Sequence, residues 1–148
     1  MKSARRQARE LVVQGLYEWQ LADSGRAAII DHLATQPHFM RADRGFLEQL
    51  LEGVMTERES LDQRLSLLID RPLTQVSPVE RAILWLASYE LAHFPETPFR
   101  VILNEAIDLA KRFGGTDGHK YINGVLDRLV TRERPEERQR PVARQKIS

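Results

Sequence analysis

The chain has 148 residues, of which 42% are hydrophobic and 29% charged, a composition typical of one globular domain. It contains no cysteine, which excludes a disulfide framework, a thiolate metal site and a cysteine nucleophile. No apolar run approaches the roughly 20 residues that span a bilayer, and no apolar stretch follows the basic N-terminus as in a signal peptide, so we expect a cytoplasmic protein without membrane contact.

The net charge of +1 conceals a segregation of charge along the chain. Residues 1–9 carry four basic residues and no acid, and residues 131–148 carry six basic residues against three acids. Residues 10–130 carry 12 basic and 18 acidic residues, a net charge of −6. This distribution indicates a polyanionic partner at the ends and a cationic protein partner in the middle.

Apolar residues recur at helical spacing through most of the chain, which predicts an all-α protein without strands. The stretch from Ser77 to Leu91 has the clearest helix start, with Ser77 as N-cap, Pro78 in the first turn and Glu80 completing a capping box. Its apolar residues cover almost the whole circumference, so other helices must surround it. The other expected helices span residues 3–22, 26–35, about 43–69, 99–113 and 117–130.

Several local features refine this prediction. Ser3 and Asp117 are expected to cap the first and last helices, and a bend or break is expected near Gly53. Gly124 lies within the last helix, where we expect a close helix–helix contact. From Thr131 onward Arg, Glu, Gln and Pro dominate, which predicts a basic, disordered tail over residues 131–148.

The first helix carries the clearest candidate site, formed by Lys2, Arg5, Arg6 and Arg9 on one flank, with Tyr17 further along. Such a cluster can bind a phosphate backbone and stack a base, although a solvated first turn explains it equally well. Positive charge at a helix N-terminus opposes the helix dipole and costs stability, which favours a functional role.

Nothing in the sequence indicates catalysis. The four histidines are far apart and have no metal-ligand spacing, so we expect neither a metal nor a cofactor. The segment Gly114-Gly115-Thr116-Asp117-Gly118 can cradle a phosphate at the start of the last helix, but a helix stop followed by an Asp cap is the more economical interpretation.

Three segments together resemble the NusB family of bacterial transcription antitermination factors. The first is Arg5-Arg6-Gln7-Ala8-Arg9-Glu10-Leu11 with Gln14-Gly15-Leu16-Tyr17-Glu18-Trp19-Gln20, and the second is Val79-Glu80-Arg81-Ala82-Ile83-Leu84 through Tyr89-Glu90-Leu91. The third comprises Asn104-Glu105-Ala106-Ile107-Asp108-Leu109-Ala110-Lys111 and Lys120-Tyr121-Ile122-Asn123-Gly124-Val125-Leu126-Asp127. Their order and spacing agree from residue 2 to about 130.

The resemblance implies one NusB-like helical domain over residues 1–130, with six or seven helices in two small bundles near 1–70 and 71–130. It implies binding to the boxA element of ribosomal RNA leader transcripts together with NusE, a small-subunit ribosomal protein, within the RNA polymerase antitermination complex. The RNA-binding residues it implies are Lys2, Arg5, Arg6, Arg9, Tyr17, His119, Lys120 and Tyr121. For NusE it implies the central helix, where we expect the exposed residues Glu80, Arg81, Trp85, Ser88 and Tyr89. A place in the core explains Trp85 and Tyr89 equally well.

Two positions depart from the family pattern. Gln7 stands where the family often has a third consecutive basic residue, and Tyr121 stands where it often has Phe. Two alternatives remain open: a helical protein-interaction adaptor without RNA binding, and the RNA-binding part of an rRNA methyltransferase. The second alternative is disfavoured because 148 residues leave no room for a cofactor-binding domain.

Overall fold

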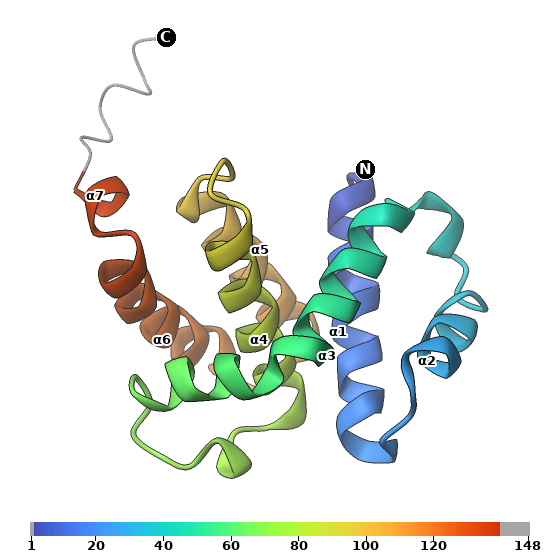
Figure 1. Cartoon of the computed structure of the whole chain (residues 1–148), viewed down its shortest axis with the longest axis horizontal. Coiled ribbons are helices and arrows are strands. Elements are labelled where there is room, and N and C mark those ends of the chain that lie inside the picture. The colour runs from blue at the N-terminus through green and yellow to red at the C-terminus, as the bar shows by residue number, and fades with distance from the viewer. Residues whose placement is uncertain (1, 140–148) are drawn as a thin grey trace, which may run out of the picture.

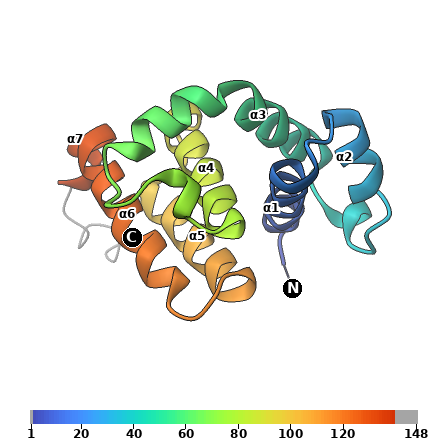
Figure 2. The same ribbon diagram turned by 90° about the horizontal axis from the view of Figure 1, so that it is seen from below.

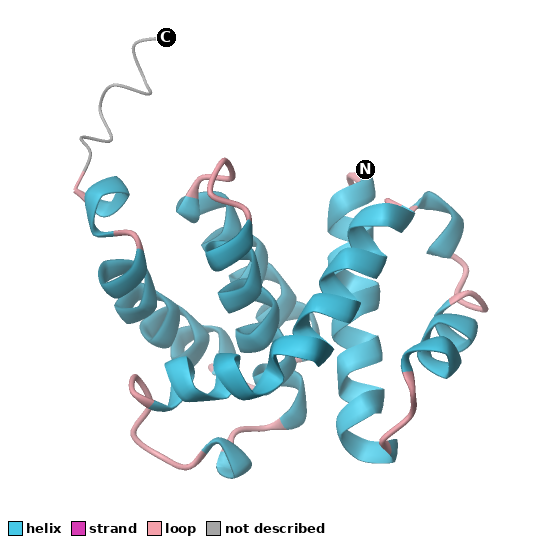
Figure 3. Cartoon of the chain, viewed as in Figure 1, coloured by secondary structure: helices cyan, strands magenta, loops and turns pink. Residues whose placement is uncertain are grey.

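The structure, a computed structural model, describes residues 2–139, and over this range it is built of helices and contains no strand (Figures 1 and 3). The all-α prediction is confirmed. The helices in chain order are α1 (Ala4–Ala22), α2 (Arg26–Leu33), η1 (Phe39–Arg41), α3 (Arg44–Ser66), η2 (Leu73–Gln75), α4 (Pro78–His93), α5 (Phe99–Phe113), α6 (Gly118–Glu133) and α7 (Pro135–Arg138).

Side-chain caps fix the start of three helices. The Ser3 hydroxyl accepts a hydrogen bond from the Arg6 amide (3.1 Å), and the Ser77 hydroxyl accepts one from the Glu80 amide (3.2 Å). Asp43 caps α3 in the same way. Both predicted serine caps are confirmed. The return half of the capping box is absent from the described part of the chain, where the Glu80 carboxylate lies against Gly118 instead.

Helix α4 is the centre of the molecule, as its all-round apolar pattern predicts. It packs against α1, α3, α5 and α6 (Figure 2), and Leu84 in its middle is fully buried. The buried side chains of α1 to α6 form one continuous hydrophobic core around it. Because this core is continuous, the division into bundles near 1–70 and 71–130 stays a prediction.

Helix α3 passes its polar middle without a break, and its ribbon curves instead (Figure 1). Gly53 is needed there for packing, because a Cβ atom at this position would lie 2.2 Å from Cζ of Tyr89. The absence of a side chain lets the Tyr89 ring approach the α3 backbone. Of the expected bend or break near Gly53, the break is therefore wrong.

Two expectations for the C-terminal part are also wrong. A Cβ atom on Gly124 would meet only the end of the Arg128 side chain, at 3.7 Å, so Gly124 marks no close helix–helix contact. Residues 131–138 are not disordered, because α6 continues to Glu133 and α7 follows it. The rest of the expected tail, residues 140–148, lies outside the described range.

Arg134 explains why this segment is ordered. Its guanidinium is almost fully buried and donates hydrogen bonds to the backbone carbonyls of Leu91, Phe94 and Thr97, at the end of α4 and in the α4–α5 connection. Glu137 accepts from Arg134 (2.9 Å) and from the Phe99 amide at the start of α5 (2.8 Å). The Leu91 carbonyl at the end of α4 and the Phe99 amide at the start of α5 are thus satisfied by residues that the sequence assigned to a tail.

Candidate nucleic-acid interface

Part of the basic cluster faces α5, whose carboxylates contact Arg6 and Arg9. The Arg6 guanidinium contacts Glu105 at 3.1 Å and also forms an ion pair with Asp108. The hydrogen bond to Glu105 is the main cause that raises the pKa of Arg6 above its usual value. Arg6 is therefore a fixed cation whose charge is already partly compensated.

Arg9 lies deeper than the sequence analysis assumed. Its side chain is 6% exposed and makes two hydrogen bonds to the Glu90 carboxylate of α4, at 2.9 and 2.8 Å. Glu105 is a further neighbour at 3.6 Å. A buried guanidinium with two hydrogen bonds to one carboxylate is not available to a phosphate. The structure therefore contradicts the expectation that Arg9 binds RNA.

The two outer cations are more accessible than Arg9. The Arg5 side chain is about half exposed, lies 4.2 Å above the Phe46 ring and is 3.9 Å from Asp43. Lys2 bonds to the carboxylate of Glu10 at 2.9 Å. Each cation of the cluster thus has a carboxylate nearby, which offsets the stability cost that the helix dipole alone would impose. The helix dipole therefore gives no reason of its own to assign the cluster a functional role.

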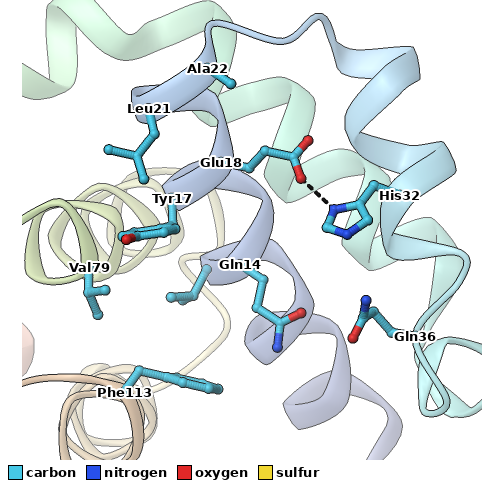
Figure 4. Close-up of a pocket in the computed structure, with 10 residues that line it drawn as sticks. Gln14, Tyr17, Glu18, Leu21, Ala22, His32, Gln36, Val79 and Phe113 are labelled. Carbon is cyan, nitrogen blue, oxygen red and sulfur yellow. Dashed lines mark hydrogen bonds and ion pairs between the residues drawn. The ribbon is translucent and has the colours of Figure 1, made fainter.

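Tyr17 continues this face toward the end of α1. Its side chain is 40% exposed and lines a largely apolar pocket of about 530 Å³ with Val79 at the start of α4 and Phe113 at the end of α5 (Figure 4). A contact between the Glu18 carboxylate and Nδ1 of His32 lies on the α2 side of the same pocket. An aromatic ring with an open face beside such a pocket is suited to stacking a base.

The first turn of α6 lies next to the start of α4. A Cβ atom on Gly118 would be 2.7 Å from the Glu80 carboxylate, so the two helix starts are in direct contact. His119 is half-buried, and Lys120 is exposed and 3.3 Å from Asp117. Asp117 occupies the N-cap position in the left-handed region, with φ of 64°, but its side chain makes no capping hydrogen bond, so the predicted side-chain cap is wrong.

Arg71 covers one face of the Tyr121 ring. The Arg71 guanidinium lies 4.5 Å from the ring centroid, and the hydroxyl is buried without a hydrogen-bond partner among the described residues. Burial raises the pKa of this hydroxyl above its usual value. Stacking of a base on Tyr121 stays a prediction, and it requires the ring face that Arg71 leaves open or a movement of Arg71.

Sequence reasoning missed two cations at this surface. Arg71 precedes Pro72 in the α3–α4 connection, where no helical period marks it. Arg112 lies at the end of α5, 3.8 Å from Glu10, with a side chain that is 54% exposed. Its position on the polar face of α5 was visible in the sequence, but its proximity to α1 was not.

The expected protein-partner surface on α4 is mostly interior. Trp85 and Ser88 are fully buried and Tyr89 is 6% exposed, so the expectation that they are exposed is wrong. The Trp85 indole donates to Asp62 of α3 at 2.7 Å, which satisfies its only polar atom in place. Only Glu80 and Arg81, both half-buried, are left for direct contact, and Arg81 is already 3.3 Å from Asp62.

Two further observations bear on the kind of protein this is. In the part of the chain that the structure describes, no three His, Asp or Glu side chains gather as a metal site would require. Over the same range, every helix is too short or too polar to cross a membrane.

Fold and site together define an all-helical protein with a mixed cationic and aromatic face along its first helix and at the start of its sixth. A family model described as the NusB family matches residues 6–131, and the chain belongs to this family.

Relatives of known name agree with this assignment. The transcription antitermination protein NusB of Burkholderia lata is 51% identical over 138 residues, covering 93% of this chain and 95% of the relative. The protein of the same name from Burkholderia thailandensis has the same identity and coverage.

Solved structures agree as well. A structure of T. maritima NusB superposes with a TM-score of 0.80 at 28% identity, covering 93% of this chain and 97% of that chain. A structure described as antitermination factors NusB and NusE in complex with dsRNA shares the fold, with a TM-score of 0.78, 20% identity, and coverage of 86% of this chain and 96% of that chain.

Proposed function

We propose that this chain is a non-catalytic, RNA-binding factor of transcription antitermination that works in the cytoplasm. In this proposal it binds the boxA element of ribosomal RNA leader transcripts together with NusE, in the antitermination complex of RNA polymerase. Support comes from its relatives, since proteins 51% identical to it carry the name transcription antitermination protein. A protein of the same fold has been crystallised with NusE and RNA.

One structural observation carries the RNA part of the proposal. Two candidate segments, about 100 residues apart in the sequence, meet at the start of α4. Tyr17 of α1 lines a pocket with Val79, and Gly118 of α6 lies against the next residue, Glu80. A strand of RNA crossing this junction could thus contact an exposed aromatic ring on α1 and the exposed Lys120 on α6.

The contacts do not contribute equally. Arg5 and Lys120 are the most available cations, because each is largely exposed and its ion pair is on the surface, where such pairs are weak. Lys2 is about one third exposed, but its partner Glu10 is buried, so this pair is harder to exchange for a phosphate. Arg6 can reach a phosphate only by exchanging it for Glu105 or Asp108. Arg9 is excluded by its burial.

For NusE, the proposal now rests on Glu80 and Arg81 and on the charge of the body, which is −6 over residues 10–130 and suits a basic ribosomal protein. Trp85, Ser88 and Tyr89 can act on NusE binding only by shaping α4 from inside. Glu80→Gln tests direct contact with NusE. The Glu80 carboxylate makes no capping hydrogen bond in the described structure, so this change should alter NusE binding without destabilising α4.

The decisive experiment is a titration with boxA RNA across a series of salt concentrations, with and without NusE. Wild-type protein should bind RNA with an affinity that falls with salt, and NusE should increase it. Tyr17→Ala should lose about 1–3 kcal/mol of RNA affinity, whereas Tyr17→Phe retains the stacking face and serves as the matched control. NusE binding without salt-dependent RNA affinity would reject this proposal in favour of a protein-interaction adaptor.

A further inference from the structure

A second pocket, between α1, η1 and α5, has features that the proposed interface does not use. Its volume is about 320 Å³, and its lining consists of Lys2, Gln7, Glu10, His38, Arg41 and Arg112. Three cations therefore surround a space that holds one carboxylate. With His38 neutral, the lining has an excess of positive charge.

The single carboxylate organises two of the cations and cannot neutralise the third. Glu10 is 5% exposed, and its Oε1 contacts both Lys2, at 3.0 Å, and Arg112, at 3.8 Å. Arg41 is exposed and has no carboxylate within 4.0 Å among the described residues. Its guanidinium offers paired N–H donors that match the oxygens of a phosphate.

Gln7 and His38 add further polar groups to the lining of the pocket. Gln7 is 6% exposed and contributes an amide. The Nε2 atom of His38 is buried and makes no hydrogen bond within the described structure. A buried polar atom without a partner costs free energy, and in the tautomer that carries the proton on Nε2 this atom can donate a hydrogen bond to an oxyanion.

The neighbouring pocket shows why an anion should prefer this place. It lies between α1 and α5 and shares Lys2, Glu10 and Arg112; Arg6 and Lys111 also line it, but so do Glu105 and Asp108, so four cations face three carboxylates there. Glu105 and Asp108 pair with Arg6 and would repel an anion. The η1 side of Lys2 and Arg112 lacks them, so the attraction for an oxyanion is stronger there.

We propose that the pocket between α1, η1 and α5 binds a phosphate group, held by Arg41, Arg112 and Lys2. Two sources share this chemistry: a backbone phosphate of bound RNA, which rests on the proposed function, and free inorganic phosphate, which does not. In the first case the RNA path extends from α1 onto η1, a segment that sequence reasoning left out.

The test compares Arg41→Gln and Arg112→Gln with Arg44→Gln. The control removes the same charge three residues from Arg41, at a side chain outside the pocket. Salt-dependent titration with boxA RNA forms one arm, where loss of one phosphate contact lowers the slope of log K against log salt by about 0.7. The other arm follows backbone amide NMR signals of residues 38–41 and 112 during titration with inorganic phosphate at constant ionic strength. Thermal melts confirm that each variant is folded.

A lower salt slope for both pocket variants but not for Arg44→Gln assigns the pocket to an RNA phosphate. Saturable shifts with inorganic phosphate that vanish in both pocket variants assign it to free phosphate. If folded variants keep the wild-type slope and wild-type protein shows no saturable shift, the pocket proposal is rejected while the proposed function stands. If wild-type protein fails to bind boxA RNA at all, the proposed function fails and the NMR arm alone decides the pocket.

Discussion

Replacing Arg9 with Met separates a structural role from RNA binding in the basic cluster of α1. The Arg9 and Glu90 side chains are 6% and 3% exposed and are joined by two hydrogen bonds, at 2.9 and 2.8 Å. Removing one member leaves a buried charge uncompensated, which costs about 3–5 kcal/mol. A domain is usually stable by about 5–15 kcal/mol, so Arg9→Met should lose a large part of its unfolding free energy.

Urea unfolding followed by circular dichroism measures this loss. Arg5→Met is the matched control, because its half-exposed guanidinium contributes a cation–π contact with Phe46, worth about 0.5–1 kcal/mol, and a long surface ion pair with Asp43 that adds little. The double variant Arg9→Met with Glu90→Leu should regain most of the lost stability, since no charge is left buried. A wild-type unfolding midpoint for Arg9→Met, combined with weaker RNA binding, would refute this reasoning and return Arg9 to the RNA surface.

Three further substitutions test the interior. Trp85→Ala should cost about 3–5 kcal/mol of stability, measured by urea unfolding, and normal stability with weak NusE binding would show that Trp85 is a contact residue after all. Tyr121→Phe should melt at or above the wild-type temperature, because the hydroxyl it removes is buried without a described partner; an early melt would contradict that. Arg134→Ala should cost at least about 1–3 kcal/mol by removing the hydrogen bonds to the Leu91 and Thr97 carbonyls, and should speed amide hydrogen exchange in the α4–α5 connection; unchanged exchange there would contradict the role of Arg134.

The sequence was sufficient for the helices because their signals are local. Ser3 and Ser77 cap α1 and α4 through hydrogen bonds to residues three positions later, so spacing alone identifies them. The all-round apolar pattern of α4 likewise implies burial without any knowledge of its neighbours. Trp85 is part of this apolar pattern, so the pattern already indicated that Trp85 is buried and not exposed.

The site was less predictable because its contacts are not local. Arg9 and Glu90 are 81 residues apart, and a helical period shows which flank Arg9 occupies but not which helix lies against that flank. Asp117 has the residue type and position of an N-cap, yet its backbone adopts the left-handed region and its side chain turns to Lys120. Such outcomes depend on how helices pack, which spacing along one chain does not encode.

The arginines of α1 differ in solvent exposure, and this difference limits how many phosphates the helix can neutralise. Arg5 is half exposed, Arg6 is held by Glu105 and Asp108, and Arg9 is buried. An RNA phosphate that binds Arg6 must displace those carboxylates, so the gain is the difference between two charge-assisted contacts and not the whole of one. The displaced carboxylates then repel the same phosphate. The salt dependence of RNA binding should therefore reflect fewer ion pairs than the four basic residues of this cluster suggest, because carboxylates of the protein already compensate part of their charge.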